Sequence, residues 1–169
     1  MERDSLLEKI KTQDILFADL EKNYPGITQT ENDQEIRYTI LIVDDEKSII
    51  NSVKRMLMDD NYDILTASSG SEGIKMLKNQ DVHLIISDQK MPGMDGLDFL
   101  VWAKGVYPEI MTLMMTAYAD INAAADAINT AGIYKFILKP LDEDDFRITV
   151  KRCLELRQIV IDRNILAGE

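Results

Sequence analysis

The stretch Leu84-Ile85-Ile86-Ser87-Asp88-Gln89-Lys90-Met91-Pro92-Gly93-Met94-Asp95-Gly96 joins an apolar run to a loop that contains one proline and two glycines. The run 82–86 is short, rich in β-branched residues and bounded by turn signals, which predicts a strand buried on both faces of a parallel sheet. Asp88 is then expected just past the end of that strand. Ligands of open α/β sheets bind outside the carboxyl ends of the strands, so Asp88 is a candidate site residue. Taken alone, this stretch also fits an aspartate that caps the next helix or begins a turn.

Short apolar runs and segments with helical spacing alternate along the rest of the chain. We expect strands at 40–43, 62–67, 111–115 and 133–138, and helices at 46–59, 69–78, 97–106, 120–130 and from about 142. With the strand at 82–86, these segments form five strand–helix units. They predict an α/β fold with a flavodoxin-like, doubly wound, five-stranded parallel sheet in the order 2-1-3-4-5, and with helical extensions at both ends.

The chain divides into four predicted segments. They are an amino-terminal amphipathic helix at 1–25, a linker at 26–37, the α/β domain at 38–158 and a C-terminal helical extension at 159–169. The apolar face of the first helix, with Leu6 and Ile10, is expected to be buried on its own domain, on a second copy or on a partner. In the last helix Cys153, Leu156 and Val160 approximate a heptad seam. This seam predicts either pairing between protomers or folding back onto the amino-terminal helix.

The composition restricts the partners and the compartment. A net charge of −11 at pH 7 opposes nonspecific binding to nucleic acid, so we expect no nucleic-acid contact. The single cysteine cannot form an internal disulfide, and the single histidine leaves no zinc-binding cluster. No run approaches the roughly 18 apolar residues of a membrane helix, and the charged amino terminus lacks the apolar core of a signal peptide. We therefore expect a cytoplasmic protein without membrane contact.

The predicted strand order brings the carboxyl ends of several strands together. Asp44 and Asp45 follow the first strand, Asp88 the third, Thr116 the fourth and Lys139 the fifth. Three carboxylates in one cleft repel one another unless a cation neutralises them, and Mg²⁺ is the cation that best fits such oxygen ligands. The sequence therefore predicts a Mg²⁺ site.

This constellation is suited to phosphoryl transfer. An ionised Asp88 beside Mg²⁺ can attack an activated phosphoryl group in line, while the Lys139 ammonium balances charge on the equatorial oxygens. The product is an aspartyl phosphate. Its oxygens are strong hydrogen-bond acceptors, which favours an inward movement of Thr116 so that its hydroxyl donates to them. Phe136 is placed to fill the space behind Thr116.

The same residues resemble the receiver domain of bacterial two-component response regulators, over about 38–158. In this resemblance Asp44-Asp45 correspond to the acidic metal pair, Asp88 to the phosphoacceptor, Thr116 to the switch hydroxyl, Phe136 to the switch aromatic, and Lys139-Pro140 to a lysine and proline commonly joined by a cis peptide.

The resemblance also implies a set of metal ligands and a lifetime for the phosphoryl group on Asp88. The metal shell would consist of Asp45 and Asp88 directly, Asp44 through water, and the backbone carbonyl of Lys90. Lys90 and Tyr118 stand at two positions that tune the phosphoryl lifetime in the family. Because both side chains would flank the path of the attacking water, we expect slow self-dephosphorylation.

We predict a phosphorylation-dependent switch that catalyses only its own phosphorylation and dephosphorylation. A sensor histidine kinase or a phosphotransfer protein would supply the phosphoryl group, and the surface formed by helix 120–130, strand 133–138 and the last helix would change. This surface or the terminal helices are the expected faces of a homodimer, and an output domain is expected beyond the last helix. One alternative is a Mg²⁺-dependent phosphohydrolase with an Asp nucleophile, which usually carries a second acid where this chain has Lys90. The other is an inactive, receiver-like interaction domain.

Overall fold

The computed structural model describes residues 36–167, apart from the side chains of 126–130 and 164–167. The predicted helix at 1–25 and most of the linker at 26–37 lie outside the described residues. One parallel sheet contains β1 Tyr38–Val43, β2 Tyr62–Ala67, β3 Leu84–Asp88, β4 Met111–Ala117 and β5 Lys135–Lys139. Its order, β2-β1-β3-β4-β5, confirms the predicted topology.

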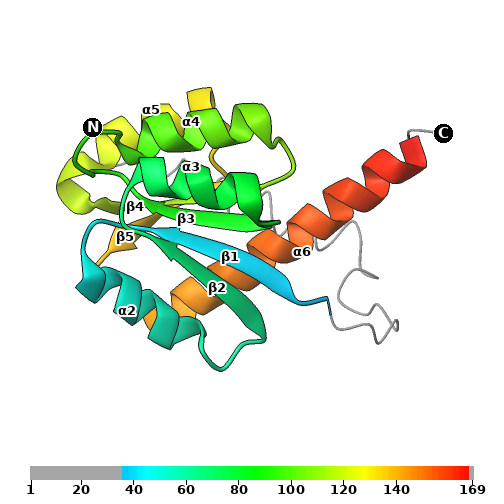
Figure 1. Cartoon of the computed structure of the whole chain (residues 1–169), viewed down its shortest axis with the longest axis horizontal. Coiled ribbons are helices and arrows are strands. Elements are labelled where there is room, and N and C mark those ends of the chain that lie inside the picture. Colours follow the sequence, from blue (N-terminus) through cyan, green and yellow to red (C-terminus); the bar gives the residue numbers. More distant parts are fainter. Residues whose placement is uncertain (1–35, 168–169) are drawn as a thin grey trace, which may run out of the picture. The chain divides into compact units, whose positions relative to one another are not determined.

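Helices cover both faces of this sheet (Figure 1). On one face lie α2 Lys47–Leu57 and α6 Glu143–Ala167, and on the other lie α3 Gly70–Asn79, α4 Gly96–Val106 and α5 Ile121–Ala131, which follows the short turn η1 Tyr118–Asp120. Side-chain caps start three of these helices, because Ser69 accepts the Glu72 N–H before α3, Asp95 accepts the Asp98 N–H before α4 and Asp142 accepts the Asp145 N–H before α6. The doubly wound architecture is therefore as predicted.

The core lies on both sides of the central strands. Every residue of β3 is buried, as expected for a strand covered by helices on both faces. On the side of α2 and α6, the core includes Ile40 and Ile42 of β1, Val53 of α2 and Phe146 of α6. The tight packing of these side chains fixes the strand ends that carry the polar residues.

The strand that leads to Asp88 begins two residues later than predicted, and Asp88 is its last residue. Val82 is buried, but pairing with β1 starts only at Leu84, which lies opposite Ile40. His83 precedes the strand: its imidazole Nδ1 accepts the Thr39 N–H at 2.9 Å, and its backbone N–H donates to Thr39 O at 2.9 Å. An apolar run shows which residues are buried, whereas the strand bounds depend on the neighbouring strands.

The last helix, α6, is 25 residues long and continues past the edge of the sheet (Figure 1). The predicted heptad seam is wrong at Cys153, which is completely buried in the core of its own domain. Positions further along the helix remain accessible, since Val160 is 47% exposed. Despite its length, α6 does not qualify as a membrane span, and neither does any other helix between residues 36 and 167.

Candidate functional site

The strand register brings the predicted polar residues to one edge of the sheet. Val43 of β1 pairs with Ser87 of β3, which sets Asp44 beside Asp88. Asp88 in turn pairs with Met115, so Thr116 follows directly on the neighbouring strand. Lys139 ends β5 opposite Ala117 of β4. The convergence predicted from the strand order is therefore present.

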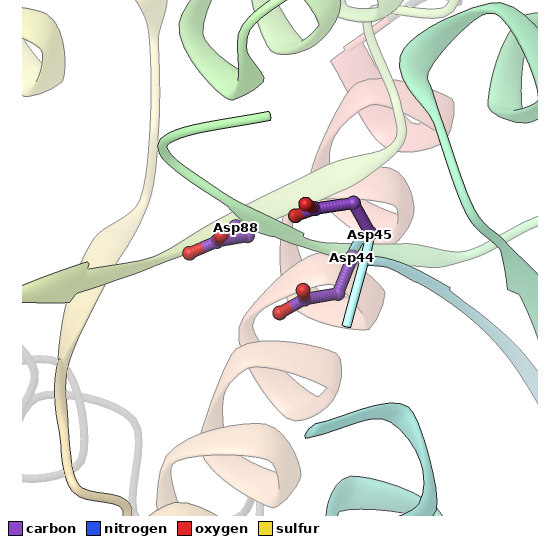
Figure 2. A group of neighbouring side chains, drawn as sticks. All are labelled: Asp44, Asp45 and Asp88. Atoms are coloured by element: carbon purple, nitrogen blue, oxygen red, sulfur yellow. The ribbon is translucent and has the colours of Figure 1, made fainter. Parts of the chain in front are cut away.

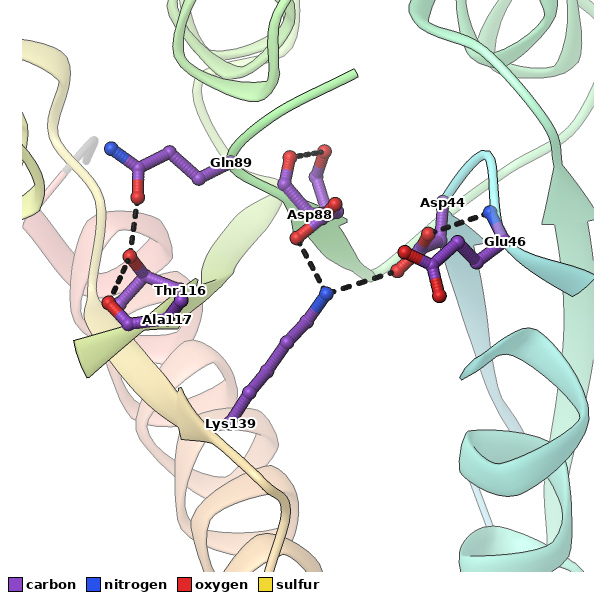
Figure 3. A network of polar contacts seen from close by, with 8 residues as sticks. Asp44, Glu46, Asp88, Gln89, Thr116, Ala117 and Lys139 are labelled. Atoms are coloured by element: carbon purple, nitrogen blue, oxygen red, sulfur yellow. Dashed lines mark hydrogen bonds and ion pairs between the residues drawn. The ribbon is translucent and has the colours of Figure 1, made fainter. Parts of the chain in front are cut away.

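Lys139 supplies positive charge at this edge. Its Nζ lies 2.8 Å from Asp88 Oδ1 and 3.7 Å from Asp44 Oδ2 (Figure 3). Burial by itself lowers the pKa of Lys139, but the hydrogen bond and charge of Asp88, together with the charge of Asp44, outweigh burial and raise that pKa above its ordinary value. Lys139 is therefore charged at neutral pH. The peptide between Lys139 and Pro140 is cis, as the family resemblance implied.

Three carboxylates form an acidic cluster at the same edge. Asp44, Asp45 and Asp88 each offer an oxygen atom, and these atoms all lie within 4.8 Å of one another (Figure 2). Asp44 and Asp88 are buried, whereas Asp45 is exposed. Asp44 Oδ1 accepts the Glu46 N–H at 2.9 Å, but Asp44 Oδ2 is buried and accepts no hydrogen bond from the residues that the structure describes. A set of carboxylate oxygens, one of which is buried and accepts no hydrogen bond from the described residues, fits a hard divalent cation such as Mg²⁺.

The electrostatics of Asp44 support the same conclusion. Burial raises the pKa of Asp44 above its ordinary value, and the nearby charges of Asp88 and Asp45 add to the rise. The Glu46 N–H and the Lys139 ammonium oppose it. A divalent cation would stabilise the ionised carboxylates and lower this pKa.

Thr116 contacts a residue to which the sequence analysis gave no role. The Thr116 hydroxyl donates to Gln89 Oε1, and Ala117 O is a second acceptor at 3.3 Å (Figure 3). The threonine is only 1% exposed. The position of Gln89 directly after Asp88 is the only signal in the sequence that could have drawn attention to it.

The other predicted residues surround this centre. Lys90 extends its side chain, which is 74% exposed, so that Nζ lies 2.9 Å from Asp120 Oδ1. Tyr118 is exposed in η1, and Phe136 is buried in β5 opposite Met114 of β4. These positions do not test the predicted roles of Lys90 and Tyr118 in the phosphoryl lifetime or of Phe136 in switching, which stay predictions.

Comparisons with known proteins agree with this geometry. Residues 40–151 match the family model of the response regulator receiver domain. The hydrogenase transcriptional regulatory protein HoxA of Cupriavidus necator is 36% identical over 128 residues, which cover 76% of this chain and 26% of that protein. The structure of adenylate cyclase from Rhodopirellula baltica is 29% identical with a TM-score of 0.74, over 79% of this chain and 99% of that chain. A response regulator receiver domain protein from Clostridium thermocellum is 28% identical with a TM-score of 0.68, over 73% of this chain and 98% of that chain.

These similarities concern one domain. The chain spans about a quarter of the length of the curated relatives that it matches. The family match covers most of the chain and includes Asp44, Asp88, Thr116 and Lys139. This chain therefore belongs to the receiver domain family of the response regulators.

Proposed function

We propose that the chain is a phosphorylation-dependent signalling switch in which Asp88 accepts a phosphoryl group from a sensor histidine kinase or a phosphotransfer protein. The observation that carries the proposal is the 2.8 Å contact between Lys139 Nζ and Asp88 Oδ1, beside the carboxylates of Asp44 and Asp45. Phosphoryl transfer to an aspartate requires a nucleophilic carboxylate, a neighbouring cation and a metal site. Membership of the receiver family supports the same function.

Asp88 is the nucleophile in this proposal. One of its carboxylate oxygens attacks the phosphorus atom in line, so that an O–P bond forms while the bond to the leaving group of the donor breaks and its electron pair departs with that group. Lys139 stays within hydrogen-bond reach of Asp88 and offsets negative charge on the transferred oxygens. Asp88 is only 7% exposed, which limits the access of competing water.

Asp44, Asp45 and Asp88 would hold Mg²⁺, and the backbone carbonyl of Lys90 is the further predicted ligand. When bound, the ion supplies positive charge that neutralises the phosphoryl oxygens near the carboxylates. Asp44 Oδ2, which is buried and accepts no hydrogen bond from the described residues, is the feature that most favours a bound cation. Catalysis is proposed to be limited to the domain's own phosphorylation and dephosphorylation.

Incubation with Mg²⁺ and acetyl phosphate tests this proposal. We expect the intact mass to rise by one phosphoryl group in the wild type and not in Asp88→Asn. Asp45→Asn should slow the reaction because it removes a metal ligand, whereas Asp81→Asn makes the same charge change at an exposed position before β3 and should not. Phosphorylation that persists in Asp88→Asn would exclude Asp88 as the acceptor.

The two alternative functions predict different results. A Mg²⁺-dependent phosphohydrolase would turn over an external phosphate ester and lose this activity in Asp88→Asn. An inactive interaction domain would gain no mass from acetyl phosphate or from a histidine kinase.

We further propose that partners bind the surface formed by α5, β5 and α6, which changes on phosphorylation. Leu138 of β5 and Ile148 of α6 are exposed, so this surface offers apolar area to a partner or a second copy. The matched part of HoxA is only 26% of that protein, so most of HoxA lies outside the receiver domain. By analogy, we propose that an output domain is joined to α6 in a longer protein. Sedimentation with and without beryllium fluoride and Mg²⁺ would detect a phosphorylation-linked homodimer through this surface or through the terminal helices.

The phosphoryl lifetime is a separate part of the proposal. The long side chain of Lys90 and the aromatic ring of Tyr118 are proposed to hinder the water that attacks the aspartyl phosphate. The half-life of the phosphorylated wild type should therefore exceed those of Lys90→Asn and Tyr118→Ala. A wild-type half-life no longer than those of the variants would refute this role.

A further inference from the structure

We infer that Gln89 holds Thr116 away from the phosphorylation site and so opposes the phosphorylated state of the switch. The inference rests on the proposed function, because it concerns the response of Thr116 to a phosphoryl group on Asp88. The Thr116 hydroxyl donates to Gln89 Oε1, and Figure 3 shows both side chains turned away from the contact between Asp88 and Lys139. A hydroxyl has one proton to donate, and here that proton is directed at Gln89 Oε1 and, at 3.3 Å, at Ala117 O, so it is not available to an oxygen on Asp88.

The backbone of Gln89 is fixed on both sides. Its N–H donates to Met115 O at 2.9 Å, and its carbonyl accepts the Gly96 N–H at 2.8 Å. These hydrogen bonds join Gln89 to β4 and to the start of α4, so its backbone cannot follow Thr116 toward Asp88. When Thr116 donates its one proton to an oxygen on Asp88, the hydrogen bond to Gln89 Oε1 is lost, and this loss disfavours the phosphorylated state.

A second contact joins the loop after β3 to the segment that follows β4. Lys90 Nζ lies 2.9 Å from Asp120 Oδ1. Asp120 stands at the N-cap of α5, yet its carboxylate makes no capping hydrogen bond and is engaged by Lys90 instead. Because the Lys90 side chain is largely exposed, this ion pair is weak, and the hydrogen bond between Gln89 and Thr116 is the principal restraint.

The affinity for beryllium fluoride, an analogue of the phosphoryl group, measures this restraint in the presence of Mg²⁺. Gln89→Leu removes the acceptor and keeps most of the side-chain volume. The net strength of one hydrogen bond between uncharged groups predicts about two- to tenfold tighter binding in this variant. Gln80→Leu at the exposed C-cap of α3 is the matched control and should leave the affinity unchanged.

A double-mutant cycle shows whether Gln89 acts through Thr116. In a Thr116→Val background, Gln89→Leu should no longer tighten binding, because the hydroxyl that Gln89 holds is absent. No gain in the wild-type background, or an equal gain in both backgrounds, would overturn the inference. Urea unfolding reports whether each variant is folded, and Gln89→Met serves in place of Gln89→Leu if the latter does not fold. Failure of the wild type to bind beryllium fluoride would instead contradict the proposed function itself.

Discussion

The close approach of α4 to the strand that carries Asp88 gives a prediction with a matched control. A Cβ atom on Gly96 would lie 1.8 Å from the carbonyl oxygen of Asp88 and 3.0 Å from the Cα of Gln89. Both contacts are with backbone atoms, so no side-chain rotation can relieve the overlap. In Gly96→Ala either α4 moves away from β3 or the backbone of Asp88 shifts. Either movement strains the hydrogen bond of 2.8 Å from Gly96 N–H to Gln89 O.

We expect Gly96→Ala to lower the free energy of unfolding by about 3 kcal/mol. An overlap with backbone falls at the upper end of the about 1–3 kcal/mol that overpacking costs in a dense interior. Loss of the hydrogen bond adds about 1 kcal/mol, and the higher helix propensity of alanine offsets about 1 kcal/mol. If the overlap is relieved by a shift of the Asp88 backbone, the same variant should also bind beryllium fluoride more weakly.

Gly105→Ala in the same helix is the control. A Cβ atom there meets nothing within 4 Å, so alanine should raise the free energy of unfolding by about 0.4–1 kcal/mol. Urea unfolding followed by circular dichroism measures both variants, and beryllium fluoride binding reports the site. If Gly96→Ala is as stable as Gly105→Ala, the argument from the close approach is wrong.

Three further predictions concern ionisable side chains of the domain. Lys139→Met should lower the free energy of unfolding by about 2–3 kcal/mol in metal-free buffer, because it leaves Asp44 and Asp88 without their cation, and Mg²⁺ should reduce the loss measured in urea. Burial, with a smaller contribution from a nearby arginine, lowers the pKa of His83 below its ordinary value of 6.5. As the pH falls below about 6.5, the unfolded chain therefore protonates at His83 before the folded chain does, so the contribution of His83 lowers the free energy of unfolding as the pH falls. NMR titration of this sole histidine should give a pKa below that of a free imidazole. Burial also raises the pKa of the Cys153 thiol, so thiol reagents should label it only as fast as the domain opens, whereas labelling at the rate of a free thiol would contradict its burial.

Residues with restricted chemistry were predictable from the sequence. Asp88 follows a buried apolar run and Lys139 follows a shorter apolar run, and parallel strands present their carboxyl ends at one edge of a sheet. Right-handed crossovers then limit the strand order to few choices. The convergence of these residues at one edge follows from that order, whereas the 2.8 Å contact between Lys139 Nζ and Asp88 Oδ1 depends on their side-chain conformations.

The limits of strands and the surroundings of apolar residues were less predictable. β3 extends to Asp88 because pairing with Met115 continues the ladder beyond the apolar run, whereas Val82 is buried without belonging to the strand. The heptad pattern correctly marked Cys153 as apolar and helical. It could not distinguish a position that faces the domain core from one that faces a partner, because both require the same kind of side chain.

Gln89 illustrates why the energetics of a switch are harder to predict than its chemistry. Phosphoryl transfer requires a carboxylate, a hydroxyl and an ammonium, which restricts the residues at Asp88, Thr116 and Lys139. A neutral amide after Asp88 satisfies no such requirement, and its contact with Thr116 depends on side-chain torsion angles that no motif encodes. One hydrogen bond contributes about 0.5–1.5 kcal/mol, which is small beside the stability of a domain of about 5–15 kcal/mol. The same free energy changes a two-state equilibrium by about two- to tenfold. On the proposed mechanism, receivers that share all the reactive groups can therefore differ in their response to phosphorylation through positions such as Gln89.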